Sequence, residues 1–192
     1  MPDDNEDPPM TPDSRELPIA FWLMPCAADL HWLNDVIAAL ARTHSTPNFA
    51  AHVSLHVGSV NPDKLQPVID QVAGLAPPTM LTAGSTLHGP TRFRALTIDL
   101  PTGPLCALAD ALAARVPIDP SFRLDAHLSL IYGEFDENLR SALAASHDYR
   151  GRRLRFDAIA AVAPAIGARD FADVSGWRII AEARLRGGLR AG

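Results

Sequence analysis

Cysteine, lysine and long apolar runs are scarce in this chain. Only two of its 192 residues are cysteines, Cys26 and Cys106, and they lie far apart with no Cys-x-x-Cys pair. This spacing excludes a disulfide framework and is typical of a protein from a reducing compartment. The first long apolar run, residues 17–30, is too short to span a membrane and is broken at Pro25. It also follows an acidic segment, where a secretory signal needs a basic one, so we expect a cytoplasmic protein.

An excess of charge of one sign is missing from the body of the chain. The formal net charge is −5, from 17 basic and 22 acidic residues. Residues 1–16 carry all of it, with one arginine against six acidic residues, so the remaining residues balance at zero. A neutral body has no overall field that attracts a polyanion, and any phosphate recognition must be local. The only lysine is Lys64; the other basic residues are arginines, which suit bidentate contacts.

The composition, with 47% hydrophobic and 20% charged residues, is that of an ordinary globular protein. Residues 1–16 are acidic and rich in proline, and we predict a disordered lead-in there. Residues 17–187 are predicted to form one domain, followed by a tail at 188–192. The domain is expected to have two lobes, at about 17–100 and 101–187, with elements able to exchange between them.

The order of the predicted elements repeats along the chain. The first half is predicted to form a strand, a helix, a strand, a helix and two strands, over residues 17–25, 30–43, 51–58, 63–73, 80–87 and 92–100. The second half is predicted to form a helix, a strand, a helix and two strands, over residues 105–115, 123–132, 136–146, 152–164 and 176–185. This order indicates a duplicated α+β unit.

One tetrapeptide form occurs in both halves, each time in the strand after a helix. His52-Val53-Ser54-Leu55 and His127-Leu128-Ser129-Leu130 share the order His, apolar, Ser, apolar. Serine and threonine make up 19 of the 192 residues, so chance gives this order to about 2% of histidines. Two cases among seven histidines, at equivalent places of a repeat, favour a functional pair over two structural ones.

The spacing of the motif places its polar side chains together. Residues i and i+2 of a strand point to the same face, so His52 shares a face with Ser54, and His127 with Ser129. If the halves pack about a pseudo-two-fold axis, both pairs converge on one cleft. Two histidines can then act as general base and general acid near neutral pH, and two hydroxyls can donate to phosphate oxygens. This chemistry requires no metal or other cofactor.

Paired His-x-Ser/Thr motifs in a duplicated α+β chain resemble the 2H phosphoesterase superfamily, and within it the cyclic phosphodiesterases of the plant and yeast type. The resemblance covers about residues 17–187 and includes residues 21–25, 47–49 and 127–132 around the motifs. It implies a bilobal fold whose antiparallel sheets surround a central cleft carrying both motifs. It also implies metal-independent hydrolysis of a cyclic phosphodiester, either a nucleoside 2′,3′-cyclic phosphate or ADP-ribose cyclic phosphate. We expect a monomer, and the neutral body and the aromatic positions favour a small nucleotide as its substrate.

The resemblance further implies that three aromatic residues, Trp22, Phe93 and Tyr132, line the cleft and bind the substrate. Strict alternation would turn Tyr132 away from His127, so its place in the cleft needs a bulge or the end of the strand. Which histidine is the base and which the acid stays open, because the two motifs are alike.

Two other functions stay open. One is a 2′,3′-cyclic phosphodiesterase acting on RNA ends, or an enzyme like the 2′–5′ RNA ligases. The other is a non-catalytic module that binds nucleotides or RNA. The basic run at residues 150–155 could guide RNA or could be a solvated edge. Arg92, Arg94 and Arg123 lie near the predicted cleft strands and could contact a distal phosphate.

His56 adds a further histidine near the first motif. With His52 it forms the His-x-x-x-His spacing of a helical metal site, but this segment alternates as a strand and no glutamate follows His52, which argues against zinc. By alternation His56 shares the face of His52 and could lie at the rim of the site.

Overall fold

Antiparallel strands form two sheets in the computed structural model, which describes residues 16–164 and 171–187. The predicted tail, and all of the predicted lead-in except Glu16, lie outside these residues. Sheet A has the order β2 (Val53–Val60), β1 (Leu17–Pro25), β7 (Arg153–Ala163) and β3 (Thr79–Thr82), and β8 (Arg178–Arg184) also pairs with β7. Sheet B has the order β4 (Thr86–Leu87), β5 (Leu96–Asp99) and β6 (His127–Ile131).

Five helices and two short 3₁₀ turns are found among the described residues. The helices are α1 (Ala27–His44), α2 (Pro62–Ala73), α3 (Cys106–Ala113), α4 (Glu137–Ser146) and α5 (Phe171–Gly176). The 3₁₀ turns are η1 (Arg92–Arg94) and η2 (Gly103–Leu105). None of the described helices is both long enough and apolar enough to cross a membrane.

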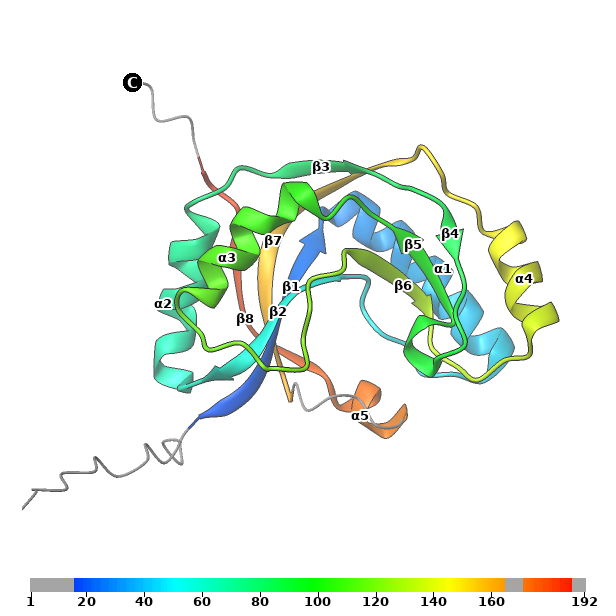
Figure 1. Ribbon diagram of the computed structural model, residues 1–192, viewed down its shortest axis with the longest axis horizontal. Helices are drawn as coiled ribbons and strands as arrows, with labels where there is room; N and C mark the ends of the chain where they lie inside the picture. The colour runs from blue at the N-terminus through cyan, green and yellow to red at the C-terminus, as the bar shows by residue number, and fades with distance from the viewer. Residues whose placement is uncertain (1–15, 165–170, 188–192) are drawn as a thin grey trace, which may run out of the picture.

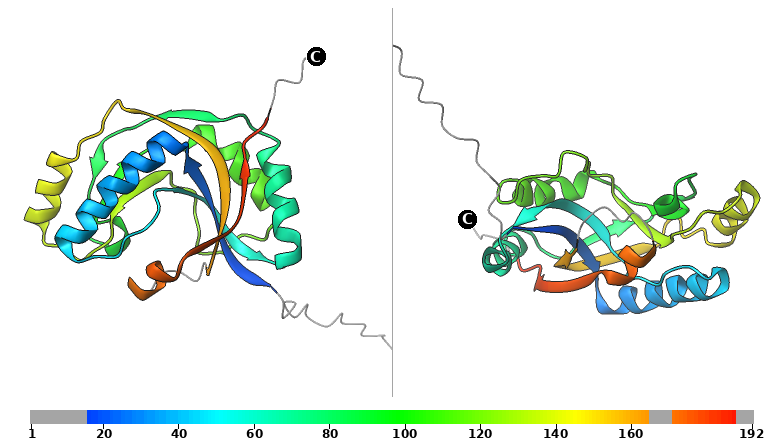
Figure 2. Two further views of the ribbon diagram at one scale, coloured as in Figure 1. Left: turned by 180° about the vertical axis from the view of Figure 1, so that it is seen from behind. Right: turned by 90° about the horizontal axis from the view of Figure 1, so that it is seen from below.

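Each sheet takes strands from both halves of the chain. β7 and β8 complete sheet A beside β1, β2 and β3, whereas β4 and β5 complete sheet B beside β6. The helices are shared in the same way, because α1 contacts β6 while α3 contacts β2 and α2 packs against β7 and β8. The two sheets lie next to each other with helices at the outer sides (Figure 1), and sheet A is strongly curved (Figure 2). The predicted α+β class with antiparallel sheets is therefore confirmed.

The predicted strands over 80–87 and 92–100 are shorter in the structure because the chain changes sheets there. β3 pairs with β7 in sheet A, and β4 pairs with β5 in sheet B. The three residues between β3 and β4 cross from sheet A to sheet B. Within this crossing, the Gly84 N–H donates to the carbonyl oxygen of Asp99, the last residue of β5. Residues 92–94 form η1 instead of a strand, which places Phe93 in a turn.

The first helix begins earlier than predicted. Cys26 precedes its first turn. The Asp29 carboxylate accepts a hydrogen bond of 2.8 Å from the backbone N–H of Arg155 and one of 3.5 Å from the Cys26 thiol. A carboxylate in the first turn also interacts favourably with the positive end of the helix dipole. Asp29 therefore ties the start of α1 to β7.

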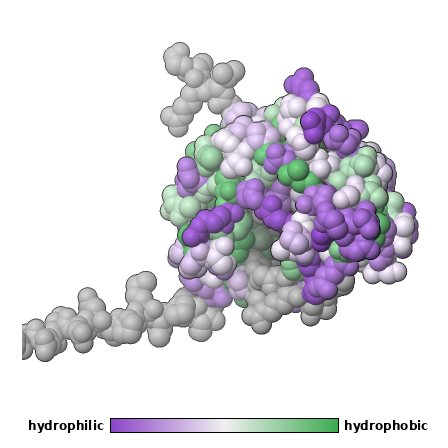
Figure 3. Space-filling view, turned by 45° about the vertical axis from the view of Figure 1, so that its right-hand side comes forward, coloured by the Kyte–Doolittle hydropathy of each residue, from purple (hydrophilic) through white to green (hydrophobic). Residues whose placement is uncertain are grey.

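The two faces of sheet A belong to different clusters. Phe21 and Leu23 of β1 enter the main core with buried residues of α1 and α2. Trp22 and Met24, which alternate with them, enter a smaller cluster with Ala160 of β7. This alternation places Trp22 on the opposite face of the sheet from the main core. On one side of the molecule the surface is hollowed, with hydrophobic walls and hydrophilic residues around them (Figure 3).

Candidate active site

Both His-x-Ser motifs stand at the start of a strand that bulges directly after the serine. In the first motif, Ser54 pairs with Trp22 and His56 pairs with Phe21, so Leu55 is the extra residue of the bulge. An extra residue on one strand changes which face the following side chains take. His56 therefore lies on the face of Phe21, and the expectation that it shares the face of His52 is wrong.

The second motif has the same irregularity at the same place. Ser129 pairs with Thr97 and Ile131 pairs with Leu96, so Leu130 is the extra residue. Each bulge comes one residue after the serine of its motif. The two strands thus agree in the register of their pairing as well as in their sequence, which is the relation expected of a duplicated unit.

His56 has its own buried partners away from the site. Its Nε2 lies 3.0 Å from the Val116 carbonyl oxygen, and its ring lies 5.9 Å from that of Phe21 and 6.4 Å from that of Phe122. Burial lowers the pKa of His56. It is a packed histidine of the core behind β2.

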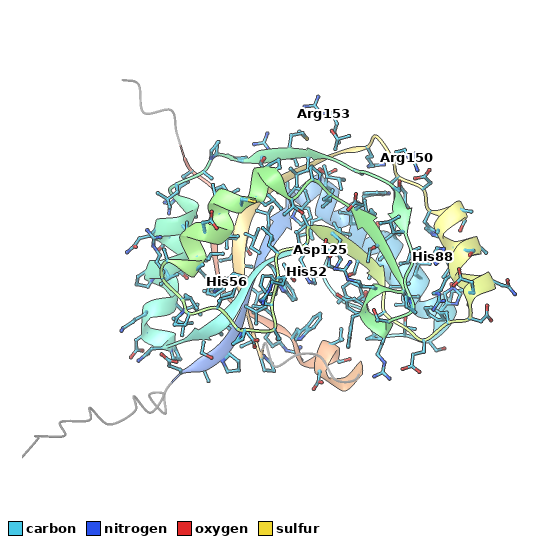
Figure 4. All side chains as sticks on the ribbon, in the orientation of Figure 1. His52, His56, His88, Asp125, Arg150 and Arg153 are labelled. Atoms are coloured by element: carbon cyan, nitrogen blue, oxygen red, sulfur yellow. The ribbon has the colours of Figure 1, made fainter. Side chains whose placement is uncertain are left out.

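The two motif histidines are oriented by the same backbone contact. Nδ1 of His52 lies 2.7 Å from the Ala50 carbonyl oxygen, and Nδ1 of His127 lies 2.7 Å from the Asp125 carbonyl oxygen. A carbonyl only accepts, so we infer that Nδ1 carries the proton in both neutral rings. Nε2 of each ring is then left to exchange a proton with a substrate. His52 directly precedes β2 of sheet A, Asp125 lies two residues before β6 of sheet B, and both are labelled near the middle of the view in Figure 4.

His52 is enclosed by aromatic rings. The Trp22 ring stacks on it with 3.6 Å between centroids and 9° between planes, and the Trp177 ring lies edge-on at 6.0 Å. Only 7% of the residue is exposed. Burial lowers its pKa from 6.5 to about 4; the bond to Ala50 opposes this shift, and the nearby charge of His127 adds to it. His52 is therefore neutral at physiological pH.

His127 lies among charged groups instead. Asp99 is its cross-strand partner, and Arg94 forms an ion pair with the Asp125 side chain. One guanidinium nitrogen of Arg94 is 3.4 Å from Nδ1 of His127. Burial lowers the pKa of His127 and the Arg94 charge lowers it further, whereas the backbone bond to Asp125 and the two carboxylates raise it.

The other two arginines near the predicted cleft strands have different partners. Arg92 forms an ion pair with Glu134, and Arg123 donates to the carbonyl oxygens of Pro120 and Phe122. Of the three arginines, Arg94 is the one that the structure places beside a motif histidine.

The two serines differ in their surroundings. Ser129 is buried near the Tyr132 phenol, whose pKa is raised to about 12 by burial, while the Ser129 side chain opposes this shift. Ser54 is half-buried beside Trp22, and its hydroxyl has no hydrogen-bond partner within the described part of the chain. Tyr132 reaches Ser129 because of the bulge at Leu130 and because β6 ends at Ile131.

The three predicted cleft aromatics are linked to one another through Trp177, and Trp22 contacts His52, but they are not free stacking surfaces. Trp22 is 4% exposed, because His52 covers one face of its ring. Tyr132 is buried and stacks on Phe49 with 4.2 Å between centroids. Phe93 is half-buried and lies edge-on to Tyr132 at 5.2 Å.

Trp177 is the aromatic residue of this group that sequence reasoning missed. It lies between α5 and β8, at 5.3 Å from Trp22 and 6.1 Å from Tyr132. No helix is predicted at 171–176, and a single tryptophan outside both motifs gives no pattern that points to the cleft. Within the described ranges, no group of three or more histidine, cysteine, aspartate or glutamate residues could hold a metal ion.

Comparisons with known proteins place the fold. No family model and no curated protein matches the chain. TT0787 of Thermus thermophilus matches 89% of this chain and 99% of its own, with TM-score 0.57 and 13% identity. Escherichia coli LigT matches 90% of this chain and 99% of its own, with TM-score 0.55 and 15% identity. A further crystal structure, of a phosphoesterase, matches 88% and 98%, with TM-score 0.57 and 17% identity.

At these identities the likeness concerns the fold, and it extends over nearly the whole of each chain. The neighbours are members of the superfamily that the paired motifs resemble. The chain therefore has the 2H phosphoesterase fold, with one His-x-Ser motif in each half of a duplicated architecture.

Proposed function

We propose that this protein hydrolyses a 2′,3′-cyclic phosphodiester of a small nucleotide to a phosphomonoester. The observation that carries the proposal is the matched pair of motifs, each on a strand bulged after its serine and each with its histidine anchored through Nδ1. Each motif contributes one Nε2 atom and one hydroxyl, and together these groups suit the acid–base catalysis and charge stabilisation of an in-line displacement by water.

The surroundings of the histidines support one division of their roles. The reactive form of an acid–base pair holds one proton, and that proton resides on the group that is protonated more easily. His52 is desolvated by Trp22 and has no carboxylate partner among the described residues, whereas His127 faces the carboxylates of Asp99 and Asp125. His52 is thus the base that takes a proton from the attacking water. His127 is the acid that protonates the ribose oxygen as its bond to phosphorus breaks.

The serines hold the phosphate during this step. The hydroxyl of Ser54 donates to one non-bridging oxygen, and the hydroxyl of Ser129, near the Tyr132 phenol, donates to another. Such bonds stabilise the charge that builds on these oxygens in the transition state.

The related fold in LigT supports a nucleotide as the substrate class. LigT has been crystallised with phosphate, with 3′-AMP and with NADP⁺, at 15–16% identity to this chain. A nucleotide can therefore occupy a fold of this kind.

RNA ends are the second candidate substrate, and the basic run at 150–155 gives them little support. The Arg152 guanidinium lies 3.6 Å over the Trp32 ring, and Arg150 donates to the Ser85 hydroxyl. Arg150 and Arg153 lie toward the edge of the molecule, away from His52 (Figure 4). The body of the chain is also neutral and has no overall field that attracts a polyanion. We therefore favour a single small nucleotide over an RNA chain as the substrate.

The proposal is tested by incubating the protein with the four 2′,3′-cyclic mononucleotides and with an oligonucleotide that ends in a 2′,3′-cyclic phosphate. EDTA is present throughout, and the products are resolved into 2′- and 3′-phosphates. We expect turnover of the mononucleotides in EDTA. Turnover of the oligonucleotide alone would favour the RNA-end enzyme, and binding without any product would favour the non-catalytic module.

A further inference from the structure

A cavity of about 300 Å³ adjoins His52. Its wall comes from three places in the sequence: Trp22 of β1, the loop between α1 and β2, and the segment from α5 into β8. Four of its lining residues also contact the histidine: Ala50 through its carbonyl, and Trp22, Phe49 and Trp177 through their rings. An occupant of this cavity would therefore lie directly beside a group that is held at His52.

The wall of the cavity combines aromatic and aliphatic surface with a polar border. Trp177 is half-buried, and its ring stands at 77° to that of Trp22. Ile179 at the start of β8 is 45% exposed and adds aliphatic surface to the wall. Asn48 lines the same cavity and is exposed. Its carboxamide offers two donors and one acceptor.

The backbone at Trp177 is held by the side chain of Arg178. Nη1 of Arg178 donates to the carbonyl oxygens of Ser175 and Trp177, at 2.7 and 2.8 Å. These bonds fix the turn between α5 and β8 that carries the indole. A fixed aromatic ring costs less conformational entropy on binding than a mobile one, which suits a stacking surface.

The other aromatic residues of the site do not provide such a surface. Trp22 is covered by His52 and Tyr132 by Phe49, and both are buried. Phe93 does not line this cavity. Among the described residues, Trp177 therefore combines a partly exposed aromatic ring, a cavity and a place next to His52.

We propose that this cavity binds the nucleobase of the substrate, which stacks on Trp177 and turns its polar edge toward Asn48. The inference rests on the proposed function, because the ribose links the base to the phosphate at His52. The volume is at the lower end of the range for small-molecule sites, and it suits one nucleoside better than a stretch of RNA. Planar bases stack on aromatic side chains, and their edges match a carboxamide.

The test compares two substrates that differ only in the base. One is adenosine 2′,3′-cyclic phosphate, and the other is the 2,3-cyclic phosphate of methyl riboside, which has no base. Trp177→Ala should lower kcat/KM for the adenosine substrate by about 5- to 150-fold, the usual loss for one base–aromatic stack, mainly through KM. It should leave kcat/KM for the abasic substrate nearly unchanged. Trp177→Phe should restore most of the loss.

Two further variants sharpen this result. Trp32→Ala is the matched control, because Trp32 packs against Tyr149 and Arg152 and does not line the cavity. It should change neither substrate. Asn48→Ala should reduce the preference among the four cyclic mononucleotides, because it removes the polar group at the edge of the base.

The outcomes separate this inference from the proposed function. An equal loss on both substrates in Trp177→Ala would show that the indole only supports Trp22 and His52, and would overturn the nucleobase pocket. If the wild type turns over neither substrate, the proposed function fails. Binding to the nucleobase pocket is then tested by the quenching of tryptophan fluorescence on addition of adenosine 3′-monophosphate. We expect this quenching to be lost in Trp177→Phe and kept in Trp32→Phe. Any other result would refute the nucleobase pocket.

Discussion

His52 and His127 share a backbone anchor and differ in almost everything else around them. Each donates from Nδ1 to the carbonyl two residues earlier, and each stands before a bulge of the same kind. Yet His52 lies under Trp22, while His127 lies among Asp99, Asp125 and Arg94. The duplicated backbone keeps both Nε2 atoms at equivalent places. The side chains outside the motifs then set which ring holds a proton.

Removal of either imidazole should have the largest effect. A general acid or base contributes about 10²–10⁴ in rate, so His52→Ala and His127→Ala should each lower kcat/KM by that factor while circular dichroism stays native. Because the two residues serve one displacement, the double variant should lose far less than the product of the two factors. A single variant that retains more than about a tenth of the activity would contradict the two-histidine mechanism.

A substrate with an activated leaving group should make the losses of activity in His52→Ala and His127→Ala unequal. A nucleoside 3′-(p-nitrophenyl phosphate) releases an anion that needs no protonation, so the general acid becomes dispensable. His127→Ala should then recover most of its activity relative to the wild type, and His52→Ala should not. Recovery of His52→Ala instead would reverse the two roles.

The buried histidine should make folding stability depend on pH. The pKa of His52 is lowered from 6.5 to about 4, so below pH 6.5 the unfolded chain binds a proton that the folded chain does not. The stability is therefore complete above pH 6.5 and falls toward pH 4, by on the order of 3 kcal/mol. Urea unfolding at several pH values measures this loss. His52→Gln should flatten the curve more than His127→Gln, and a curve unchanged by His52→Gln would refute the assignment.

The serines should come next. A hydrogen bond to a charged group is worth about 1.5–3 kcal/mol, so Ser54→Ala and Ser129→Ala should each lower kcat/KM by about 10- to 150-fold with unchanged unfolding midpoints. Tyr132→Phe should lower activity as well, through Ser129. Activity close to that of the wild type in both serine variants would show that the hydroxyls are structural.

The parts of this site that follow from the sequence are those with a short local pattern. Alternation places His52 with Ser54 and His127 with Ser129, and the composition of β1, β2 and β6 identifies them as strands. The repeated order of elements also predicts the α+β class. These inferences need only the periodicity of a strand and the position of the motifs in the repeat.

The parts that do not follow depend on pairing between distant segments. The bulge after Ser54 is a property of the register between β1 and β2, so alternation alone misplaces His56. Trp177 reaches the cleft only because β8 pairs with β7. The exchange of strands between the halves, which carries β4 and β5 to β6, likewise cannot be read from a list of elements.

The place of Arg94 also depends on pairing between distant segments, and its substitution should have the smallest effect on activity. In the sequence it is one of three arginines near the cleft, and only the structure places it beside Nδ1 of His127, in an ion pair with Asp125. Its charge disfavours the protonated imidazole and lowers the pKa of His127. Since both motif histidines have lowered pKa values, the maximum of kcat/KM in the wild type should lie on the acid side of pH 6.5.

Arg94→Gln should therefore move the alkaline limb of the kcat/KM profile to higher pH. The substitution removes a cation and leaves the Asp125 carboxylate unpaired, and both changes favour the proton on His127. Exposed ion pairs are worth about 0.2–1 kcal/mol, so the change at the pH optimum should be only about 1.5- to 5-fold. Arg92→Gln is the matched control, because Arg92 belongs to the same 3₁₀ turn and pairs with Glu134. A shift of the acid limb in place of the alkaline limb would mean that His127 acts as the base.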